Sequence, residues 1–311
     1  IDNLNSKYLP DLAEEKKSKY QENLKTILKQ IKQIENLVNE FSDFARMPKP
    51  HIKQNDLIKV LDENIELLRK IESNLQLLLI LIPFLFSFIG FWLIIKKLHN
   101  SSLVRIATIR KKIDFNRIIF SFVLWGALII FMVLFDYFIY PDDYKWNFKL
   151  KEFLIMLPIA FLLIPIQTSL EEFIFRGYLM EGFTSLLKNS WMPLIFTSLI
   201  FGLLHIYNPE VDKLGHGILI YYIGTGLFLG VLSIMDQGIE LSIGFHAANN
   251  LLTALLVTST WTVFQTESIL IDVSEPSLFF ETVFSLLILY PLFLYVMSMK
   301  YNWNNWKEKI F

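Results

Sequence analysis

Polar and apolar positions divide the chain into two parts near residue 73. The first 72 residues are rich in charge, with 13 Lys or Arg and 13 Asp or Glu. Apolar residues recur there at three- and four-residue steps over 27–44, the period of one face of an amphipathic helix. Pro48 ends that helix, because proline has no amide donor, and a second helical stretch follows over 57–68. We therefore predict a soluble, helical-hairpin-like segment over residues 1–72.

The second part consists almost entirely of apolar runs joined by short polar loops. Each run is close to the roughly 20 residues that cross the hydrocarbon core of a bilayer as a helix. We expect the third run to continue as one helix into a charged Glu-Glu segment. The pattern predicts an all-α, polytopic transmembrane bundle over residues 73–311. Its expected seven spans cover residues 75–95, 118–139, 153–168, 192–204, 217–235, 239–258 and 277–297.

The composition supports a membrane domain and excludes several classes of function. The chain has 311 residues, of which 53% are hydrophobic and 15% aromatic, more than a soluble core needs. A net charge of −1 gives no reason to expect nucleic acid as a partner. The absence of cysteine excludes disulfides, thiol nucleophiles and cysteine-ligated metal sites. We expect an integral membrane protein whose partners are lipid and a membrane-associated peptide or protein.

Basic residues lie mainly on one side of the predicted membrane. Positive charge favours the cytoplasmic side, so we expect the C-terminus in the cytoplasm and residues 1–72 on the other side. The side with more charge has eleven basic residues: Lys96, Lys97, Arg105, Arg110, Lys111, Lys112, Arg117, Lys188, Lys300, Lys307 and Lys309. The opposite side has four: Lys145, Lys149, Lys151 and Lys213.

Two adjacent carboxylates and an arginine end the third apolar run. Ionisable groups in the hydrocarbon region are costly unless they are paired or line a wet cavity, so their presence points to a functional site. Glu172 and Arg176 are four residues apart and share a helix face, which predicts a structural ion pair. Glu171 points elsewhere and has no such partner. We expect it to be the reactive carboxylate.

Two further polar groups interrupt later apolar runs. His205 ends the fourth run, and His246 and Asn250 lie one helical turn apart in the sixth. A lone histidine on an apolar helix is usually a core residue, but two histidines with an unpaired glutamate favour a site. Glu171 and His205 could polarise a water, directly or as ligands of Zn²⁺. His246 and Asn250 could then donate hydrogen bonds to the oxyanion.

The motifs EExxxR, FxxxH and HxxxN, in this order on successive helical segments, resemble the CPBP family. That family includes the type II CAAX prenyl endopeptidases and the bacterial Abi proteins, some linked to bacteriocin immunity. The resemblance covers residues 75–311. It implies an intramembrane protease of a bacterial inner membrane, with four catalytic residues and, if zinc is used, three metal ligands. The implied catalytic set is Glu171, His205, His246 and Asn250, and the implied ligands are Glu171, His205 and His246.

Two further interpretations accompany this reading. A catalytically silent protein of the same fold, acting in bacteriocin immunity or as a scaffold, is the alternative function. Residues 36–50, NLVNEFSDFARMPKP, resemble the dimerisation domain of nitrogen-regulation sensor histidine kinases. The phospho-acceptor helix and the ATP lid of that family are missing from the sequence, so we expect no ATP and interpret residues 1–72 as non-functional or a fusion remnant.

Smaller features have simpler interpretations. Gly226 and Gly230 have small-xxx-small spacing in the fifth run, which predicts close helix packing. Glu210, Asp212 and His216 lie in a polar loop and are expected to be solvated.

Overall fold

The computed structural model describes two parts of the chain, which form two separate compact units, Ile1–Glu63 and Asn64–Phe311. The described residues are 17, 21–26, 28–33, 35–36 and 72–310. In the first unit these residues are helical, with Leu24 buried, whereas Ile31 of the predicted apolar period is exposed. The second predicted helix, over 57–68, and nearly all of the kinase-like stretch lie outside the described residues.

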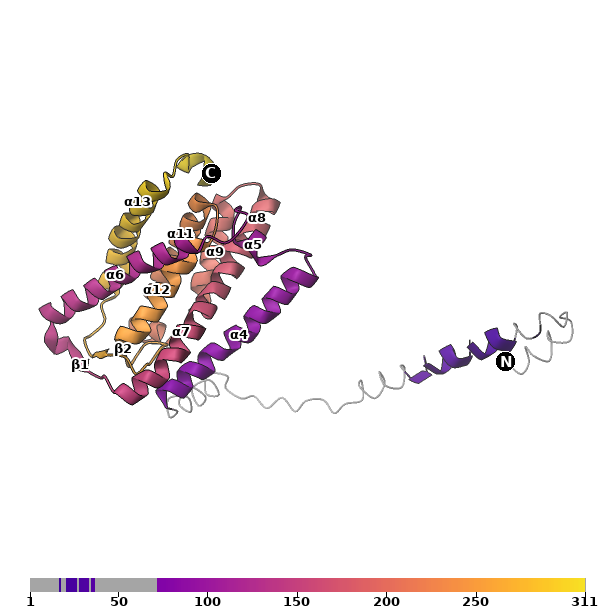
Figure 1. The fold of residues 1–311 in the computed structure, drawn as a ribbon, viewed down its shortest axis with the longest axis horizontal. Helices are drawn as coiled ribbons and strands as arrows, with labels where there is room; N and C mark the ends of the chain where they lie inside the picture. The colour runs from indigo at the N-terminus through magenta and orange to yellow at the C-terminus, as the bar shows by residue number, and fades with distance from the viewer. Residues whose placement is uncertain (1–16, 18–20, 27, 34, 37–71, 311) are drawn as a thin grey trace. The chain divides into compact units, whose positions relative to one another are not determined.

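The second unit is a bundle of helices that run alternately up and down (Figure 1). One continuous helical rod carries the Glu-Glu segment, as predicted: α7 (Leu150–Glu172) continues through the π-helix η2 (Phe173–Leu179) into α8 (Met180–Leu187). The other principal helices are α4 (Ser73–Lys97), α6 (Phe115–Ile139), α9 (Trp191–Leu203), α11 (Leu219–Asp236), α12 (Glu240–Leu256), η4 (Phe280–Leu289) and α13 (Tyr290–Tyr301). Shorter helical elements are α5 (Leu103–Ala107), η1 (Pro141–Asp143), α10 (Pro209–Leu214), η3 (His216–Ile218) and α14 (Trp306–Ile310).

The bundle is an integral membrane domain, as the sequence predicted. Within residues 72–310, five helices are long and apolar enough to cross a membrane. The predicted fourth and sixth spans correspond to α9 and α12, which have only 13 and 17 residues. The count of seven full spans is therefore not confirmed, although a helix occupies each predicted position.

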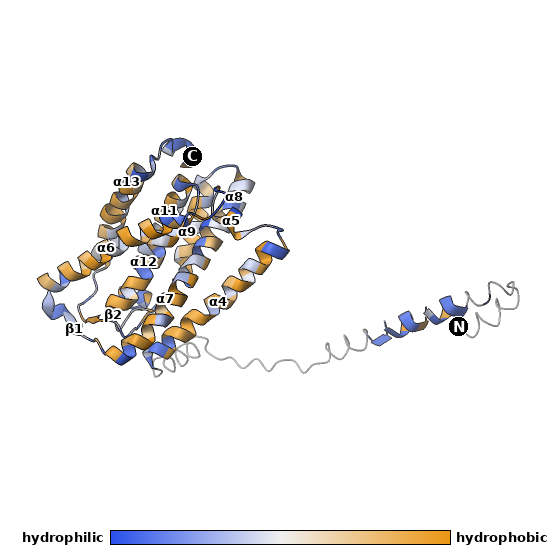
Figure 2. Cartoon of the chain, in the orientation of Figure 1, coloured by the Kyte–Doolittle hydropathy of each residue, from blue (hydrophilic) through white to orange (hydrophobic). Residues whose placement is uncertain are grey.

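Apolar residues make up most of the long helices of the bundle (Figure 2), and many of their side chains are exposed. Phe86, Phe131 and Phe138 are each more than 60% exposed. This arrangement suits lipid, in which an exposed apolar side chain has no hydration penalty. Inside, aromatic rings pack around α12, and the rings of Trp125 and Phe245 lie 4.2 Å apart.

Glycines allow the inner helices to approach closely. A Cβ on Gly226 of α11 would lie 3.0 Å from the Cα of Ser198 in α9, and one on Gly230 would overlap Leu194. These two contacts confirm the predicted packing role of both glycines. On α12, a Cβ on Gly244 would overlap the carbonyl oxygen of Ile118 in α6.

A small sheet, which the sequence pattern did not predict, lies at one end of the bundle. The strands β1 (Tyr144–Trp146), β2 (Val257–Ser259) and β3 (Leu270–Asp272) are ordered β1-β3-β2. The β1–β3 pair is antiparallel and the β2–β3 pair is parallel. Each strand has three residues, too few for a two-residue alternation to show in the sequence.

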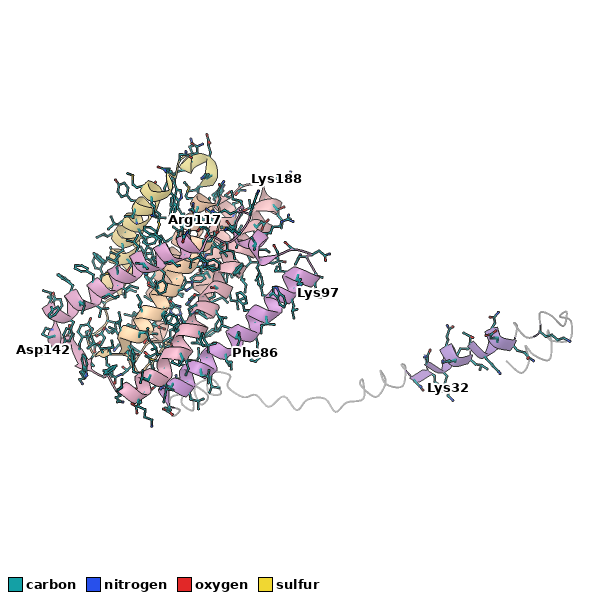
Figure 3. All side chains as sticks on the ribbon, in the orientation of Figure 1. Lys32, Phe86, Lys97, Arg117, Asp142 and Lys188 are labelled. Atoms are coloured by element: carbon teal, nitrogen blue, oxygen red, sulfur yellow. The ribbon has the colours of Figure 1, made fainter. Side chains whose placement is uncertain are left out.

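The two ends of the bundle differ in charge. Lys97, Arg117 and Lys188 lie at one end, and Asp142 lies towards the other, near β1 (Figure 3). At the first end, the loop after α4 folds onto the turn between α11 and α12, where Arg110 lies 3.1 Å from Glu240. The structure thus places the two predicted groups of basic residues at opposite ends. Which end faces the cytoplasm remains a prediction.

We expect Gly244→Ala to destabilise the bundle, because the added methyl group would collide with the backbone of α6. Overpacking of this kind costs about 1–3 kcal/mol. Gly90→Ala is the matched control, since a Cβ there would meet no atom within 4 Å. Thermal unfolding in detergent, followed by tryptophan fluorescence, should show a lower Tm for Gly244→Ala only. Equal Tm values for both variants would contradict the close approach of α6 and α12.

Candidate active site

The central feature of the site is the buried carboxylate of Glu172. Its side chain has no exposed surface, and its Oε1 accepts a hydrogen bond of 3.1 Å from Nη1 of Arg176. The predicted ion pair is therefore formed. Arg176 also donates to the carbonyl of Gly226 at 3.2 Å and lies over the ring of Phe201, 4.3 Å from its centroid. These contacts fix the guanidinium between α9 and α11.

Glu172 has a second partner that sequence reasoning missed. Nδ1 of His246 lies 2.8 Å from the same Oε1, so α12 is joined to α7 through this carboxylate. A carboxylate only accepts hydrogen bonds, which assigns the hydrogen to Nδ1 and leaves Nε2 on the side of Glu171. Glu172 therefore both pairs with Arg176 and orients a histidine.

Glu171 has different surroundings, as its position on the helix predicted. Its Oε1 accepts a hydrogen bond from Nε2 of Gln167, one turn earlier. Its Oε2 lies 3.7 Å from Nε2 of His246. His246 thus stands between the two glutamates, with one ring nitrogen towards each. Gln167 was missed because an amide inside an apolar run gives no signal of its own.

Asn250 completes this group. Its Nδ2 lies 3.4 Å from Oε1 of Gln167 and 3.5 Å from Nε2 of His246. Its Oδ1 accepts from the neighbouring Asn249, whose own side-chain oxygen accepts from Trp125 at 3.1 Å. This chain of amides fixes the direction in which the Nδ2 group of Asn250 points.

His205 occupies another wall of the same space. Its Nδ1 lies 2.8 Å from the carbonyl oxygen of Phe201, which can only accept, so this nitrogen carries the hydrogen. The imidazole stacks on the ring of Tyr222, with centroids 4.3 Å apart. In a neutral ring the other nitrogen, Nε2, is then an acceptor.

A cavity of about 720 Å³ connects these groups. Glu171, His205 and Asn250 all line it, together with apolar side chains such as Phe84 and Phe201. The described structure therefore brings together residues that lie 79 positions apart in the sequence, from Glu171 to Asn250.

One interpretation of the sequence was wrong. Glu210 is not a solvated loop residue, because it is partly buried, lines the cavity and accepts a hydrogen bond of 2.9 Å from the amide of Val263. Burial raises the pKa of its carboxyl group. Asp212 and His216 are exposed, as expected.

Zinc was one of two alternatives for activating the water, with Glu171, His205 and His246 as its ligands if it is used. Among residues 72–310 and the described part of the N-terminal unit, no three His, Asp or Glu side chains are grouped so that they could hold a metal ion. Glu171, His205 and His246 are therefore not arranged as a ligand set.

The backbone changes its winding directly after the glutamates. The π-helix η2 begins at Phe173, and such segments are rare and often occur at functional sites. Here it follows directly on the helical turn that carries Glu171 and Glu172. The i,i+4 ion-pair spacing between Glu172 and Arg176 predicted a shared face but gave no sign of this change.

Comparison with known proteins agrees with this geometry. A family model described as type II CAAX prenyl endopeptidase Rce1-like matches residues 150–252, a range that contains all six predicted site residues. The uncharacterized protein YyaK of Bacillus subtilis (strain 168) is 32% identical over 204 residues, which cover 65% of this chain and 68% of that protein. The chain belongs to the Rce1-like family. No solved structure matches it.

Removing one member of the buried ion pair should be costly. We expect Arg176→Gln to destabilise the domain by about 3–5 kcal/mol, because it leaves a buried carboxylate without its cation. The control is Lys213→Gln, which breaks an exposed pair with Glu275 and should cost less than about 1 kcal/mol. Denaturant titration in detergent measures both. A similar loss in the two variants would contradict the central role of Arg176.

Proposed function

We propose that the chain is an intramembrane endopeptidase that hydrolyses peptide bonds of membrane-associated substrates, with CAAX-like peptides as the first class to test. The observation that carries this proposal is the pair of glutamates around one histidine. Glu172 fixes His246, and Glu171 faces the cavity beside it. Membership of an Rce1-like family supports the same class of reaction.

Glu171 is the proposed general base. It takes a proton from a water in the cavity while the oxygen forms a bond to the peptide carbonyl carbon. His205, whose Nε2 is the acceptor in a neutral ring, helps to hold that water. When the C–N bond breaks, the proton on Glu171 passes to the leaving amine. Atoms and charge then balance, and the carboxylate is restored.

Asn250 and His246 are the proposed oxyanion donors. The amide of Asn250 is oriented by Gln167 and Asn249, so it can donate without reorganising. His246 can donate from Nε2 only when that nitrogen carries a hydrogen in addition to the one on Nδ1.

We place the protein in a bacterial cytoplasmic membrane with its C-terminus in the cytoplasm. The relative from Bacillus subtilis supports a bacterial setting. The concentration of lysine and arginine at one end of the bundle supports the orientation.

We expect Glu171→Gln to abolish cleavage while the fold remains intact. Loss of a general base lowers the rate by roughly 10²–10⁴-fold. The full chain would be reconstituted in liposomes with a quenched fluorescent peptide that carries a farnesylated cysteine near its C-terminus. In a second peptide, the same sequence is joined to an apolar helix and has no prenyl group. Comparison of the two peptides tests whether cleavage depends on the prenyl group. Glu181→Gln, an exposed glutamate of the same helical rod, is the control.

Histidine variants provide a second comparison. His205→Ala should lower the rate strongly, and His216→Ala, in an exposed neighbouring loop, should not. If Glu171→Gln and His205→Ala both cleave as fast as the parent chain, the enzyme proposal is wrong. A silent membrane protein of the same fold would then be the better description.

In the proposed reaction Glu171 activates the water directly, which is the metal-free alternative of the two schemes. We therefore expect EDTA and 1,10-phenanthroline to leave the rate of peptide cleavage unchanged. The measurement is the initial rate before and after dialysis against each chelator. Loss of activity that added Zn²⁺ restores would overturn the metal-free mechanism.

A further inference from the structure

A second cavity lies at the basic end of the bundle, and it shares no lining residue with the cavity around Glu171. Its volume is about 460 Å³, within the roughly 300–1,000 Å³ that is typical of ligand pockets. Residues 99–106, which connect α4 to α5 and form most of α5, make one wall. Residues 178–186 of the helical rod make the other wall. We call this cavity the α5–α8 groove.

Contacts between the two walls hold the groove in place. A Cβ on Gly177 would overlap the side chain of Ile106, so α5 lies directly against η2. Nε2 of His99 lies 3.0 Å from the hydroxyl oxygen of Tyr178, and the two rings make an edge contact with centroids 5.4 Å apart. The groove is therefore a fixed feature of the folded bundle.

The lining has a polar side and an apolar side. The side chains of Ser101, Arg105 and Ser185 supply hydrogen-bond donors. Phe183 and Leu186 supply apolar surface, and Leu186, which is 76% exposed, extends this surface towards the outside of the bundle. A soluble anion would contact the polar side alone, whereas an amphipathic molecule would contact both sides.

Arg105 is the principal charge of the groove. Its side chain is exposed, and its guanidinium makes no ion pair within residues 72–310. Lys97 and Lys188 add positive charge at the same end of the bundle (Figure 3). Glu181, the one acid among the described lining residues, is exposed and can accept hydrogen bonds from headgroup hydroxyls. A guanidinium can bind a phosphate through two parallel N–H donors, so the groove suits a phosphate ester.

The groove lies at the level where lipid headgroups are expected. Basic residues and tryptophans gather where a membrane meets water. Lys96 and Lys97 end α4, and the ammonium group of Lys96 lies over the ring of Trp92, 5.0 Å from its centroid. Trp191 begins the helix that follows α8. The groove lies between these helix ends, where a phospholipid can reach it from the bilayer.

We propose that the α5–α8 groove binds an anionic glycerophospholipid, with the lipid phosphate at Arg105 and an acyl chain along Phe183 and Leu186. Basic pockets between membrane helices bind acidic lipid headgroups in this way. The proposal is independent of peptide hydrolysis, since the groove is separate from the candidate active site. A bound lipid would hold α5 against the helical rod that carries Glu171 and Glu172.

Titration with two lipids tests the preference for charge. The full-length chain in detergent would be titrated with dioctanoyl-phosphatidylglycerol, which is anionic, and with dioctanoyl-phosphatidylcholine, which is zwitterionic. Binding would be followed by microscale thermophoresis. We expect tighter binding of phosphatidylglycerol, and Arg105→Gln should weaken that binding about five- to tenfold. Lys145→Gln, which removes another exposed positive charge at the opposite end of the bundle, should leave both affinities unchanged.

A larger side chain at Gly182 tests the position of the lipid. Gly182 lines the groove, and a Cβ there would meet no atom within 4 Å, so a leucine fits but occupies the space of the lipid. Gly90→Leu is the control, because a Cβ on Gly90 also meets no atom within 4 Å and Gly90 lies outside the groove. We expect only Gly182→Leu to lose the binding of phosphatidylglycerol and the rise in Tm that this lipid produces. Unchanged binding by Gly182→Leu would contradict the proposal.

Other results would also overturn the proposal. Equal affinity of the parent chain for the two lipids would exclude a preference for an anionic headgroup. An equal loss in Arg105→Gln and Lys145→Gln would show a response to net charge in place of a specific site. Displacement of phosphatidylglycerol by glycerol 3-phosphate at the same concentration would show that the ligand is a soluble phosphate. If Arg105→Gln does not fold, the comparison of Gly182→Leu with Gly90→Leu decides the question.

Discussion

The arrangement of the bundle depends on the burial of one carboxylate. Glu172 has no exposed surface, and charge in such a place is tolerated only with partners. Its partners come from two directions: Arg176 from the same helical rod and His246 from α12. The cost of an unpaired charge therefore links the register of α7 with that of α12. The same oxygen of Glu172 thus pairs with Arg176 and fixes the position of His246.

Close helix packing serves the same interaction. Arg176 donates to the carbonyl of Gly226, and Gly226 lies so near Ser198 that a side chain would not fit. A glycine at this position lets α11 approach α9 and leaves its carbonyl accessible to the guanidinium. Packing in the membrane relies on such small residues, because lipid supplies no hydrophobic force between helices. The glycine thus contributes both to the bundle and to the site.

The sequence predicted the helical membrane fold, the Glu172–Arg176 pair and the separate environment of Glu171, because helical period and apolar run length are local properties. It did not predict that His246 would bind Glu172, since two helices must first pack together. It misread Glu210 as solvated, because burial of a loop residue depends on the loop after β2, about fifty positions later. Gln167 and Asn249 were missed for the same reason: their roles consist entirely of contacts made in the folded state.

Two helices, α9 and α12, are too short to span the membrane, and the cavity lies where they end. α9 ends just before His205, and α12 gives way to β2 after 17 residues. Irregular backbone at membrane depth is tolerated only where protein or a wet cavity surrounds it. Here β2 pairs with β3, the amide of Val263 donates to Glu210, and the remaining space is the cavity. A pair of full-length helices would bury their backbone groups completely but would fill the volume that a water and a peptide need. The shortened helices and the small sheet thus leave the space that the proposed hydrolysis would need inside an apolar bundle.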